Sequence, residues 1–278
     1  MDLSEKHLKL RQRLGEFDGL LLAYSGGIDS AYLAFVAHQV LGDRALAVIA
    51  DSASLARSQY GDAIAFAHER AIPLKTIETD ELEREDYAAN GADRCFHCKD
   101  ELFTVLEAER QRLGFAAVAY GLNVNDKQEF RPGQRAASEH RVVAPLADAG
   151  LTKEDIRALA REAGLRIWDK PASACLSSRI EYGRRVTPEA LRMVEDAEDA
   201  LRALGLVRFR VRHHGTVARV EIAQEELAAA LNPATLKQIG QAVRSAGFAY
   251  SAVDCDGYSS GSMNEILPVE SLTAALRK

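Results

Sequence analysis

Residues 20–30, Leu-Leu-Leu-Ala-Tyr-Ser-Gly-Gly-Ile-Asp-Ser, decide the fold of this chain. The apolar first part predicts a buried strand, the two glycines a turn, and the residues that follow a helix. The first N–H groups of a helix have no partner inside it, so with the helix dipole they attract an anion. Adjacent glycines let a phosphate approach the backbone, and Ser25 and Ser30 add hydroxyl donors. We therefore predict a phosphate-binding loop.

Two familiar nucleotide loops do not fit this stretch, which lacks the lysine of Gly-x-x-x-x-Gly-Lys-Ser/Thr and the spacing of Gly-x-Gly-x-x-Gly. Its Ser-Gly-Gly-x-Asp-Ser string instead resembles the pyrophosphate loop of the ATP pyrophosphatase superfamily, whose members cleave ATP between the α and β phosphates. The alternative, an ordinary strand-to-helix turn, is disfavoured by the five matched positions of this string. The resemblance implies that the ATP phosphates are held by Ser25, Gly26, Gly27, Asp29 and Ser30. Asp29 would bind Mg²⁺, unless it serves only as an acidic residue at a helix start.

The composition is that of an ordinary enzyme: 278 residues, 47% hydrophobic, 27% charged, net charge −6. An acidic balance argues against a large nucleic-acid surface. The polar start, residues 1–6, does not resemble a signal peptide, and no apolar run approaches the ~20 residues of a membrane span. Four cysteines are too few for a disulfide framework and favour metal-binding or catalytic thiols. We expect a cytoplasmic protein.

Alternating apolar and amphipathic segments predict the main domain. Strands are expected at residues 20–23, 45–50, 73–77 and 116–120, and helices at 4–15, 31–40, 55–70 and 95–113. This alternation predicts an α/β fold with a doubly wound parallel sheet. Ligands of such sheets bind at the carboxyl ends of the strands. We therefore expect the nucleotide pocket to include Ser52, Gly121, Asn123 and Asp126.

A turn near residues 170–174 predicts the boundary between a pyrophosphate-loop domain, residues 1–170, and a smaller α+β domain, residues 171–278. The second is expected to contain a helix from Thr187-Pro188 to a glycine cap at Gly205, and a hairpin of residues 207–213 and 217–222. A helix from Asn232-Pro233 and a strand at 249–255 follow. Arg208, Arg210 and Arg212 alternate on the first hairpin strand, which indicates either a phosphate clamp or a solvated sheet face.

The cysteines allow several interpretations. Cys95-x-x-Cys98 alone is half a zinc site, a redox pair or two structural thiols. Zinc would need a fourth ligand beyond Cys175, for which only His97 or Cys255 is evident. Three thiolates could instead hold a [4Fe–4S] cluster whose open iron carries an extra sulfide. Cys255 falls in a predicted apolar strand and is expected to be buried.

A set of motifs along nearly the whole chain resembles the LarE family. These are Asp93-Arg94-Cys95 with Cys98-Lys99, Gly121-x-Asn123, Arg131-Pro132-Gly133, Pro171-Ala172-x-Ala174-Cys175-Leu176-x-Ser178-Arg179-Ile180 and Gly261-Ser262-Met263-Asn264-Glu265. LarE enzymes are ATP-dependent sulfur transferases of nickel-pincer nucleotide synthesis, the cofactor of lactate racemase. The resemblance implies that ATP·Mg²⁺ adenylates pyridinium-3,5-biscarboxylic acid mononucleotide and that sulfur then displaces AMP, once on each carboxylate. Asn125 stands where such sequences often have an acidic residue. A metal-binding role at this point of the chain is therefore left to Asp126.

The resemblance also implies roles for particular residues. Substrate-binding residues would be Lys99, Ser178, Arg179, Glu198, Arg210 and Arg212. Some family members sacrifice the sulfur of one cysteine, which becomes dehydroalanine, whereas others hold a [4Fe–4S] cluster with three. Cys95, Cys98 and Cys175 match the cluster type, with sacrifice of Cys175 as the alternative. A homohexamer is also implied.

Three other functions compete with this one. A cluster-dependent tRNA thiolase would use the same loop and cysteines, but no RNA-binding module is evident. An ammonia-using synthetase would leave the cysteines without a role, and the chain shows no glutaminase segment. A non-enzymatic ATP-binding sensor would bind ATP without turnover.

Overall fold

The computed structural model describes residues 1–128, 133–171, 174–259 and 263. Some motif residues lie outside this part of the chain, namely Arg131, Pro132, Ala172, Gly261, Ser262, Asn264 and Glu265. The chain folds into two compact units. The first consists of Met1–Glu81 and Cys95–Ser173, and the second of Leu82–Arg94 and Ala174–Lys278.

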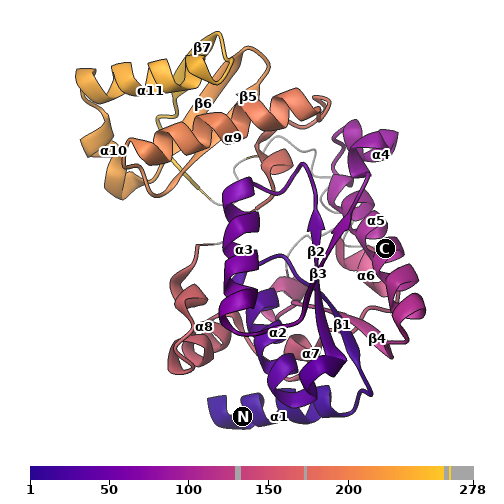
Figure 1. Ribbon diagram of the computed structural model, residues 1–278. Helices are drawn as coiled ribbons and strands as arrows, with labels where there is room; N and C mark the ends of the chain where they lie inside the picture. Colours follow the sequence, from indigo (N-terminus) through magenta and orange to yellow (C-terminus); the bar gives the residue numbers. More distant parts are fainter. Residues whose placement is uncertain (129–132, 172–173, 260–262, 264–278) are drawn as a thin grey trace. The chain divides into compact units, whose positions relative to one another are not determined.

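The first unit is built on a parallel sheet with the strand order β3-β2-β1-β4 (Figure 1). Its strands are β1 (Leu20–Ala23), β2 (Ala45–Asp51), β3 (Leu74–Glu78) and β4 (Ala117–Tyr120). Ala23, the last residue of β1, pairs with Val48 on one side and Tyr120 on the other. The carboxyl ends of the central strands therefore meet at one edge, and the predicted α/β parallel fold is confirmed.

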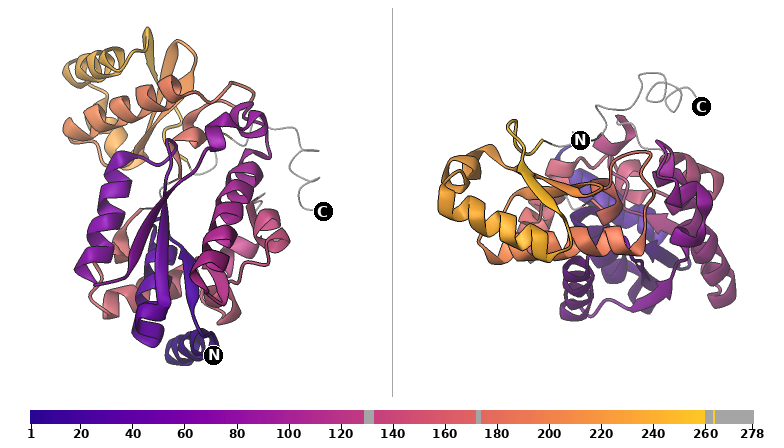
Figure 2. Two further views of the ribbon diagram at one scale, coloured as in Figure 1. Left: turned by 45° about the vertical axis from the view of Figure 1, so that its right-hand side comes forward. Right: turned by 90° about the horizontal axis from the view of Figure 1, so that it is seen from above.

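Helices cover both faces of this sheet (Figure 1; Figure 2, left). Leu20 and Leu22 join a core with α1 (Leu3–Gly15), α2 (Ile28–Leu41), α3 (Arg57–Glu69) and α8 (Lys153–Glu162). Leu21 and Ala23 join a core on the other face with α5 (Arg94–Leu113) and α6 (Gly133–Glu139). A strand buried on both faces needs a continuous apolar run, which is why residues 20–23 are all hydrophobic.

Local sequence signals set most of the helix starts. Asp2 and Thr152 cap α1 and α8 through capping boxes with Glu5 and Asp155. The predicted limits of α3 and β3 differ from the observed ones by one or two residues, as is usual at fraying ends. Helix α6 was not predicted, because its seven residues contain one apolar pair and no helical repeat. Two further short helices are α4 (Glu85–Ala88) and α7 (Pro145–Asp148).

The second unit contains a three-stranded sheet with the order β5-β6-β7. It comprises β5 (Phe209–His214), β6 (Val217–Ile222), α10 (Gln224–Ala230), α11 (Pro233–Ser245) and β7 (Tyr250–Val253), preceded by α9 (Pro188–Ala203). β5 and β6 form the predicted antiparallel hairpin, and β7 is parallel to β6 because two helices return the chain. Thr187 caps α9, and Gly205 follows it with φ +95°, as predicted.

The expectation that Cys255 is buried in the last strand is wrong. β7 ends at Val253, and Cys255 is exposed. The Asp254 carboxylate accepts a hydrogen bond from the backbone N–H of Asp256 at 2.8 Å and also pairs with Arg219. An aspartate that bonds the backbone two residues ahead forms a turn, so the chain leaves the sheet there.

Residues 82–94 belong to the second unit although they lie in sequence between the two segments of the first. Asn90 is fully buried with φ 58°, and its amide donates to the carbonyls of Glu181 at 2.8 Å and Arg184 at 2.9 Å. The N–H of Gly183 returns a bond of 3.0 Å to the Asn90 carbonyl. Asn90 thus binds residues 82–94 to the second unit, and no local sequence pattern predicts this contact.

Within the described ranges, no helix combines the length and the apolar character needed to cross a bilayer.

We predict that His213 makes the protein less stable in mild acid. Its ring is buried against Phe248, and its Nδ1 accepts the N–H of Gly215 at 3.3 Å. Burial lowers the pKa of His213, so the unfolded chain takes up this proton first as the pH falls below about 6.5, and the free energy of unfolding decreases. His213→Gln, which cannot titrate, should show a smaller fall in melting temperature between about pH 7.5 and 5.5. Equal falls would contradict the prediction.

Candidate active site

The phosphate loop joins β1 to α2. Gly26 has φ +69°, and Gly27 is the N-cap of α2 with no side-chain cap, so the first N–H groups of the helix remain available to an anion. The two hydroxyls brace the loop: Ser30 Oγ donates to the Gly27 carbonyl at 3.1 Å and lies 3.1 Å from Ser25 Oγ. The predicted loop residues therefore form one braced turn at the carboxyl end of β1.

We predict that Gly26→Ala damages both stability and ATP binding. A Cβ there would lie 2.3 Å from Ala63 Cβ, on backbone that disfavours L side chains. We expect the free energy of unfolding to fall by about 2–4 kcal/mol, which lowers the melting temperature by several degrees. ATP should bind at least about tenfold more weakly, because the loop shifts. Gly27→Ala is the matched control, because its nearest neighbour would be Ser25 Oγ at 3.5 Å and its φ is −72°. Equal melting temperatures for the two variants would contradict this prediction.

Asp29, in the first turn of α2, has one carboxylate oxygen in need of a ligand. Oδ2 forms an ion pair with Nζ of Lys153, whereas Oδ1 is buried and has no hydrogen-bond partner among the described residues. An unsatisfied buried charged oxygen costs roughly 1–3 kcal/mol or more, so a cation there is stabilising. Carboxylate oxygens are the ligands that Mg²⁺ prefers. The residues present therefore fit a magnesium ion bound by Asp29.

Lys153 is a site residue that the sequence reasoning missed. Besides pairing with Asp29, it donates its backbone N–H to Asn125 Oδ1 at 2.9 Å. It thus connects the phosphate loop to the segment after β4. Lys153 is the first residue of α8, where a cation opposes the helix dipole. This conflict with the helix dipole was the signal in the sequence that could have revealed Lys153.

The segment after β4 packs against the loop. A Cβ on Gly121 would lie 2.7 Å from the backbone nitrogen of Ser30, so only glycine allows this approach. Asn123 is fully buried; its amide donates to Asp126 Oδ2 at 3.0 Å, and its Oδ1 accepts the Asp126 N–H at 3.1 Å. Burial, with the nearby charge of Asp126, raises the pKa of Tyr120 to about 12, which keeps its hydroxyl protonated. Gly121, Asn123 and Asp126 thus lie together beside the loop.

Ser52, predicted to line the nucleotide pocket, supports a buried acid. Its hydroxyl donates to Glu81 and accepts the N–H of Ser54 at 3.0 Å. Glu81 is only 3% exposed. The hydroxyl of Ser52 is therefore already used in holding this carboxylate. The sequence did not reveal Glu81, because it lies in a charged segment without a motif.

Cys95 and Cys98 lie three residues apart in the first turn of α5, on one face of the helix. None of the four cysteines forms a disulfide. Lys99, next along α5, holds its ammonium group 5.7 Å from the centre of the Phe103 ring. Over the described stretches, no three or more His, Cys, Asp or Glu side chains are grouped so as to hold a metal ion. Cys95 and Cys98 belong to the first unit and Cys175 to the second.

Arg94 is a third residue whose role the sequence did not reveal. Its buried guanidinium donates to the Ser177 carbonyl at 2.8 Å and to the side chain of Asn90, and Ser177 is also bonded to Tyr87. Arg94 directly precedes Cys95, and Ser177 is two residues after Cys175. A bond inside the second unit therefore ties the residue next to the Cys-x-x-Cys motif to the turn that carries Cys175.

The arginines of β5 do not form a solvated face. Arg212 is 5% exposed, and its guanidinium donates to Glu221 at 2.7 Å and to the Ser178 carbonyl at 3.2 Å. Burial, followed by the positive charge of Arg179, lowers the pKa of Arg210, whose guanidinium lies 5.0 Å from the centre of the Tyr258 ring. Arg208 precedes β5 and is exposed. Partly buried guanidinium groups close together favour a phosphate, which needs bidentate donors.

The turn around Cys175 gathers the remaining predicted residues. Cys175 precedes a 3₁₀ turn, Leu176–Arg179, and its carbonyl accepts bonds from Ser178 and Arg179. Arg179 in turn pairs with Glu198 on α9. The structure therefore brings Ser178, Arg179 and Glu198 together around the backbone of Cys175.

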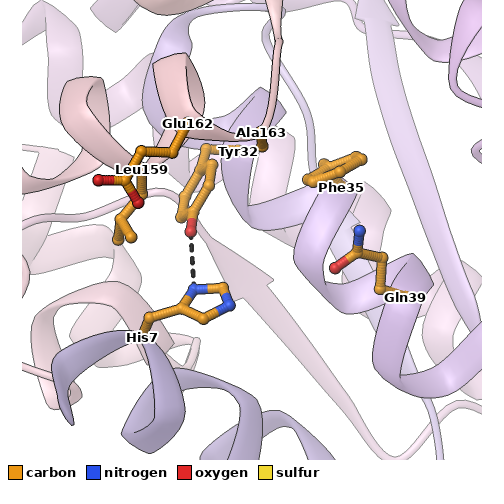
Figure 3. A pocket seen from close by; sticks show the side chains of 7 residues that line it. All are labelled: His7, Tyr32, Phe35, Gln39, Leu159, Glu162 and Ala163. Carbon is orange, nitrogen blue, oxygen red and sulfur yellow. Dashed lines mark hydrogen bonds between the residues drawn. The ribbon is translucent and has the colours of Figure 1, made fainter. Parts of the chain in front are cut away.

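Two cavities lie apart from these residues. One of about 300 Å³ is lined in the second unit by Glu181, Tyr182, Gly183 and Arg184. The other, of about 260 Å³, lies between α1, α2 and α8, where His7 Nδ1 is 2.9 Å from the Tyr32 hydroxyl (Figure 3). None of the predicted site residues lines either cavity.

Comparisons with known proteins show what the chain is similar to. The NAD synthase family model matches residues 3–106, which include the phosphate loop. An uncharacterised protein of Synechocystis sp. is 40% identical over 265 residues, covering 95% of this chain and 99% of that protein. A pyridinium-3,5-bisthiocarboxylic acid mononucleotide synthase of Lactiplantibacillus plantarum is 34% identical over 266 residues, 95% of this chain and 96% of that one. An uncharacterised protein of Methanocaldococcus jannaschii is 31% identical over 231 residues, 82% of this chain and 88% of that protein.

The loop, the parallel sheet and the family match define an ATP-using enzyme of the pyrophosphate-loop class. Similarity along nearly the whole length of the synthase is more specific. The chain belongs to the LarE family, and it is an ATP-using sulfur transferase.

Proposed function

We propose that the enzyme converts the two carboxylates of pyridinium-3,5-biscarboxylic acid mononucleotide to thiocarboxylic acids for a nickel-pincer cofactor of lactate racemase. The observation that carries this proposal is the 34% identity to the synthase over 95% of the chain. The site geometry supports it: a phosphate loop with an unpartnered acidic oxygen, an arginine cluster suited to a mononucleotide phosphate, and cysteines outside any disulfide.

The first half-reaction is adenylation. A carboxylate oxygen of the substrate attacks the α-phosphorus of ATP; the new O–P bond forms as the bond to the bridging oxygen breaks, and pyrophosphate leaves with the electron pair. In this proposal the N–H groups of Gly27 and of the start of α2, with Lys153, stabilise the developing charge. A magnesium ion held by Asp29 would supply further neutralisation of the pyrophosphate.

The second half-reaction transfers sulfur. A sulfur nucleophile attacks the acyl carbon, the C–S bond forms, and AMP leaves with the electrons of the broken C–O bond. If the nucleophile is the thiolate of Cys175, a thioester forms; loss of the Cα proton and cleavage of the Cβ–S bond then release the thiocarboxylate and leave dehydroalanine. That route gives one sulfur per chain.

A renewable route needs a sulfide that is not part of the chain. Cys95, Cys98 and Cys175 have the right chemistry to hold a [4Fe–4S] cluster, whose fourth iron would be open to a sulfide. The Arg94–Ser177 bond supports this assignment, because it joins the residue before Cys95 to the turn of Cys175. We favour the cluster route over sacrifice of Cys175.

The remaining predicted residues receive roles on the same basis. Ser25, Gly26, Gly27, Asp29 and Ser30 bind the ATP phosphates, and Ser52, Gly121, Asn123 and Asp126 shape the nucleotide side. Arg210 takes the phosphate of the mononucleotide, and Arg212, which keeps its bonds to Glu221 and Ser178, adds positive charge beside it. Lys99 is proposed to bind the same substrate. We also propose a cytoplasmic homohexamer of this chain, which light scattering of the purified protein tests; a monomer or dimer in solution would refute it.

The function is tested by pyrophosphate release from ATP with and without the mononucleotide, and by mass spectrometry of the product. We expect release to depend on the mononucleotide and to be unaffected by RNA. Release that requires RNA would identify a tRNA thiolase instead, and ATP binding without release would identify a sensor.

The sulfur source is tested by iron and acid-labile sulfide analysis after anaerobic purification and reconstitution. About four irons per chain, with the broad visible absorption of a cubane cluster, would support the cluster route. Absence of iron, with dehydroalanine at position 175 after reaction, would establish sacrifice of Cys175.

A further inference from the structure

The carbonyl oxygen of Cys175 is bonded far more heavily than a turn requires. It accepts the N–H of Ser178 at 3.0 Å, the hydroxyl of Ser178 at 2.7 Å and Nη1 of Arg179 at 2.9 Å. The same Nη1 also donates to the carbonyl of Ala174 at 2.7 Å. Two successive peptide groups, before and after the Cα of Cys175, are therefore held by one guanidinium.

The guanidinium is itself fixed from the opposite side. Arg179 is 1% exposed, and its Nε and Nη2 donate to the two oxygens of Glu198 at 3.0 and 3.3 Å. Glu198 is 3% exposed and also accepts the backbone N–H of Val211, at 3.2 Å, and a contact from Arg202 at 3.5 Å. The carboxylate of Glu198 is thus fixed by helix α9 and strand β5. It positions Arg179, and Arg179 positions the turn at Cys175.

This arrangement directs the charges of Arg179 and Glu198 at partners inside the protein. All three guanidinium nitrogens of Arg179 already donate hydrogen bonds, to Glu198, Ser178 and the two carbonyls. Both oxygens of Glu198 already accept bonds inside the protein. A substrate contact would have to break a buried ion pair, which costs several kcal/mol.

We infer that Arg179 and Glu198 are positioning residues for Cys175, and that Ser178 completes their clamp on its backbone. Fixing both peptide planes fixes the direction of the Cα–Cβ bond and limits the sulfur to the few staggered positions that rotation about this bond allows. A sulfur that must meet an acyl carbon, or bind one iron, gains from such fixation, since a misplacement of about 1 Å can cost on the order of 10²-fold in rate. The effect on turnover rests on the proposed function, whereas the clamp on the backbone does not.

Two variants test the clamp. Ser178→Ala removes one donor without leaving a buried charge, and the double variant Arg179→Met/Glu198→Met replaces the ion pair by apolar side chains of similar length, so that neither leaves an unpaired charge. Arg192→Met is the control, because this exposed arginine lies on α9 with Glu198 but contributes nothing to the turn.

The first measurement is hydrogen exchange of the Ser178 amide in the protein without substrate. We expect at least about tenfold faster exchange in both test variants and no change in the control, because the amide bonds to the clamped carbonyl. Unchanged exchange in both would overturn the inference, and this result does not depend on what the enzyme catalyses.

The second measurement is steady-state kinetics with the mononucleotide. A positioning role predicts that kcat falls by up to about 10²-fold while KM for the mononucleotide stays within about twofold. A raised KM with unchanged kcat would mean that the residues bind substrate, and would overturn the inference. If the wild type has no activity with the mononucleotide, the proposed function fails, and the exchange result alone decides about the clamp.

Discussion

Replacing Asp29 by asparagine lowers ATP-dependent pyrophosphate release by about 10²–10³-fold, which is the loss usual for removing one group that stabilises developing charge. The side chain keeps its size but loses the negative charge that fits Mg²⁺ and the ion pair with Lys153. Pyrophosphate release measured across a range of Mg²⁺ concentrations should show that the variant needs far more metal or does not respond to it.

Two other variants make this result specific. Asp43→Asn, at an exposed acid just after α2, should behave like the wild type. Lys153→Met should weaken ATP binding by about tenfold while Mg²⁺ still supports release, because the carboxylate of Asp29 remains. If Asp29→Asn keeps full activity and the usual Mg²⁺ response, Asp29 is only an acidic residue at a helix start and the magnesium assignment is wrong.

Replacing Cys175 by serine abolishes thiocarboxylate formation, a loss of at least about 10³-fold, while ATP is still bound. Both sulfur routes need this thiol, one as a ligand and the other as the sulfur itself. Product analysis and ATP binding measured on the same preparation separate the two steps. Cys255→Ala is the control: Cys255 is exposed, lies beyond β7 and has no proposed role. Normal product yield from Cys175→Ser would rule out both routes.

Cys95→Ala and Cys98→Ala distinguish the two routes. The cluster route predicts that either variant loses iron and multiple turnover but binds ATP as before, because the phosphate loop does not include α5. A single turnover with dehydroalanine at position 175 would show that Cys175 can be sacrificed. Full multiple turnover in either variant would exclude the cluster as the source of sulfur.

Features that depend on neighbouring residues were predictable from the sequence. The apolar run at residues 20–23 gave a strand buried on both faces, because such a strand has no polar side to alternate with. Gly26 and Gly27 predicted a tight turn between β1 and α2, and Thr187-Pro188 predicted the start of α9. Each of these signals acts within a few residues, so the order of elements and the parallel sheet followed from them.

The errors and omissions have one physical cause. Cys255 was expected in a strand because the predicted strand at residues 249–255 was extended past its apolar part, but the side chain of Asp254 turns the chain after β7. Residues 82–94 were not assigned to the second unit because Asn90 bonds partners about 90 positions away. The roles of Lys153 and Arg94 likewise depend on bonds to Asp29 and Ser177, which no local pattern encodes.

The sequence by itself therefore determined the class of fold, the phosphate loop and the cysteines of interest, because strand burial, glycine turns and motif spacing are properties of short stretches. Only the tertiary structure decided which site residues can meet a ligand. It placed Arg179 and Glu198 in a buried pair behind Cys175, and in the described part of the chain it left one oxygen of Asp29 without a donor. Burial and pairing arise between distant segments, and they decide whether a charged side chain binds a substrate or supports the residue that does.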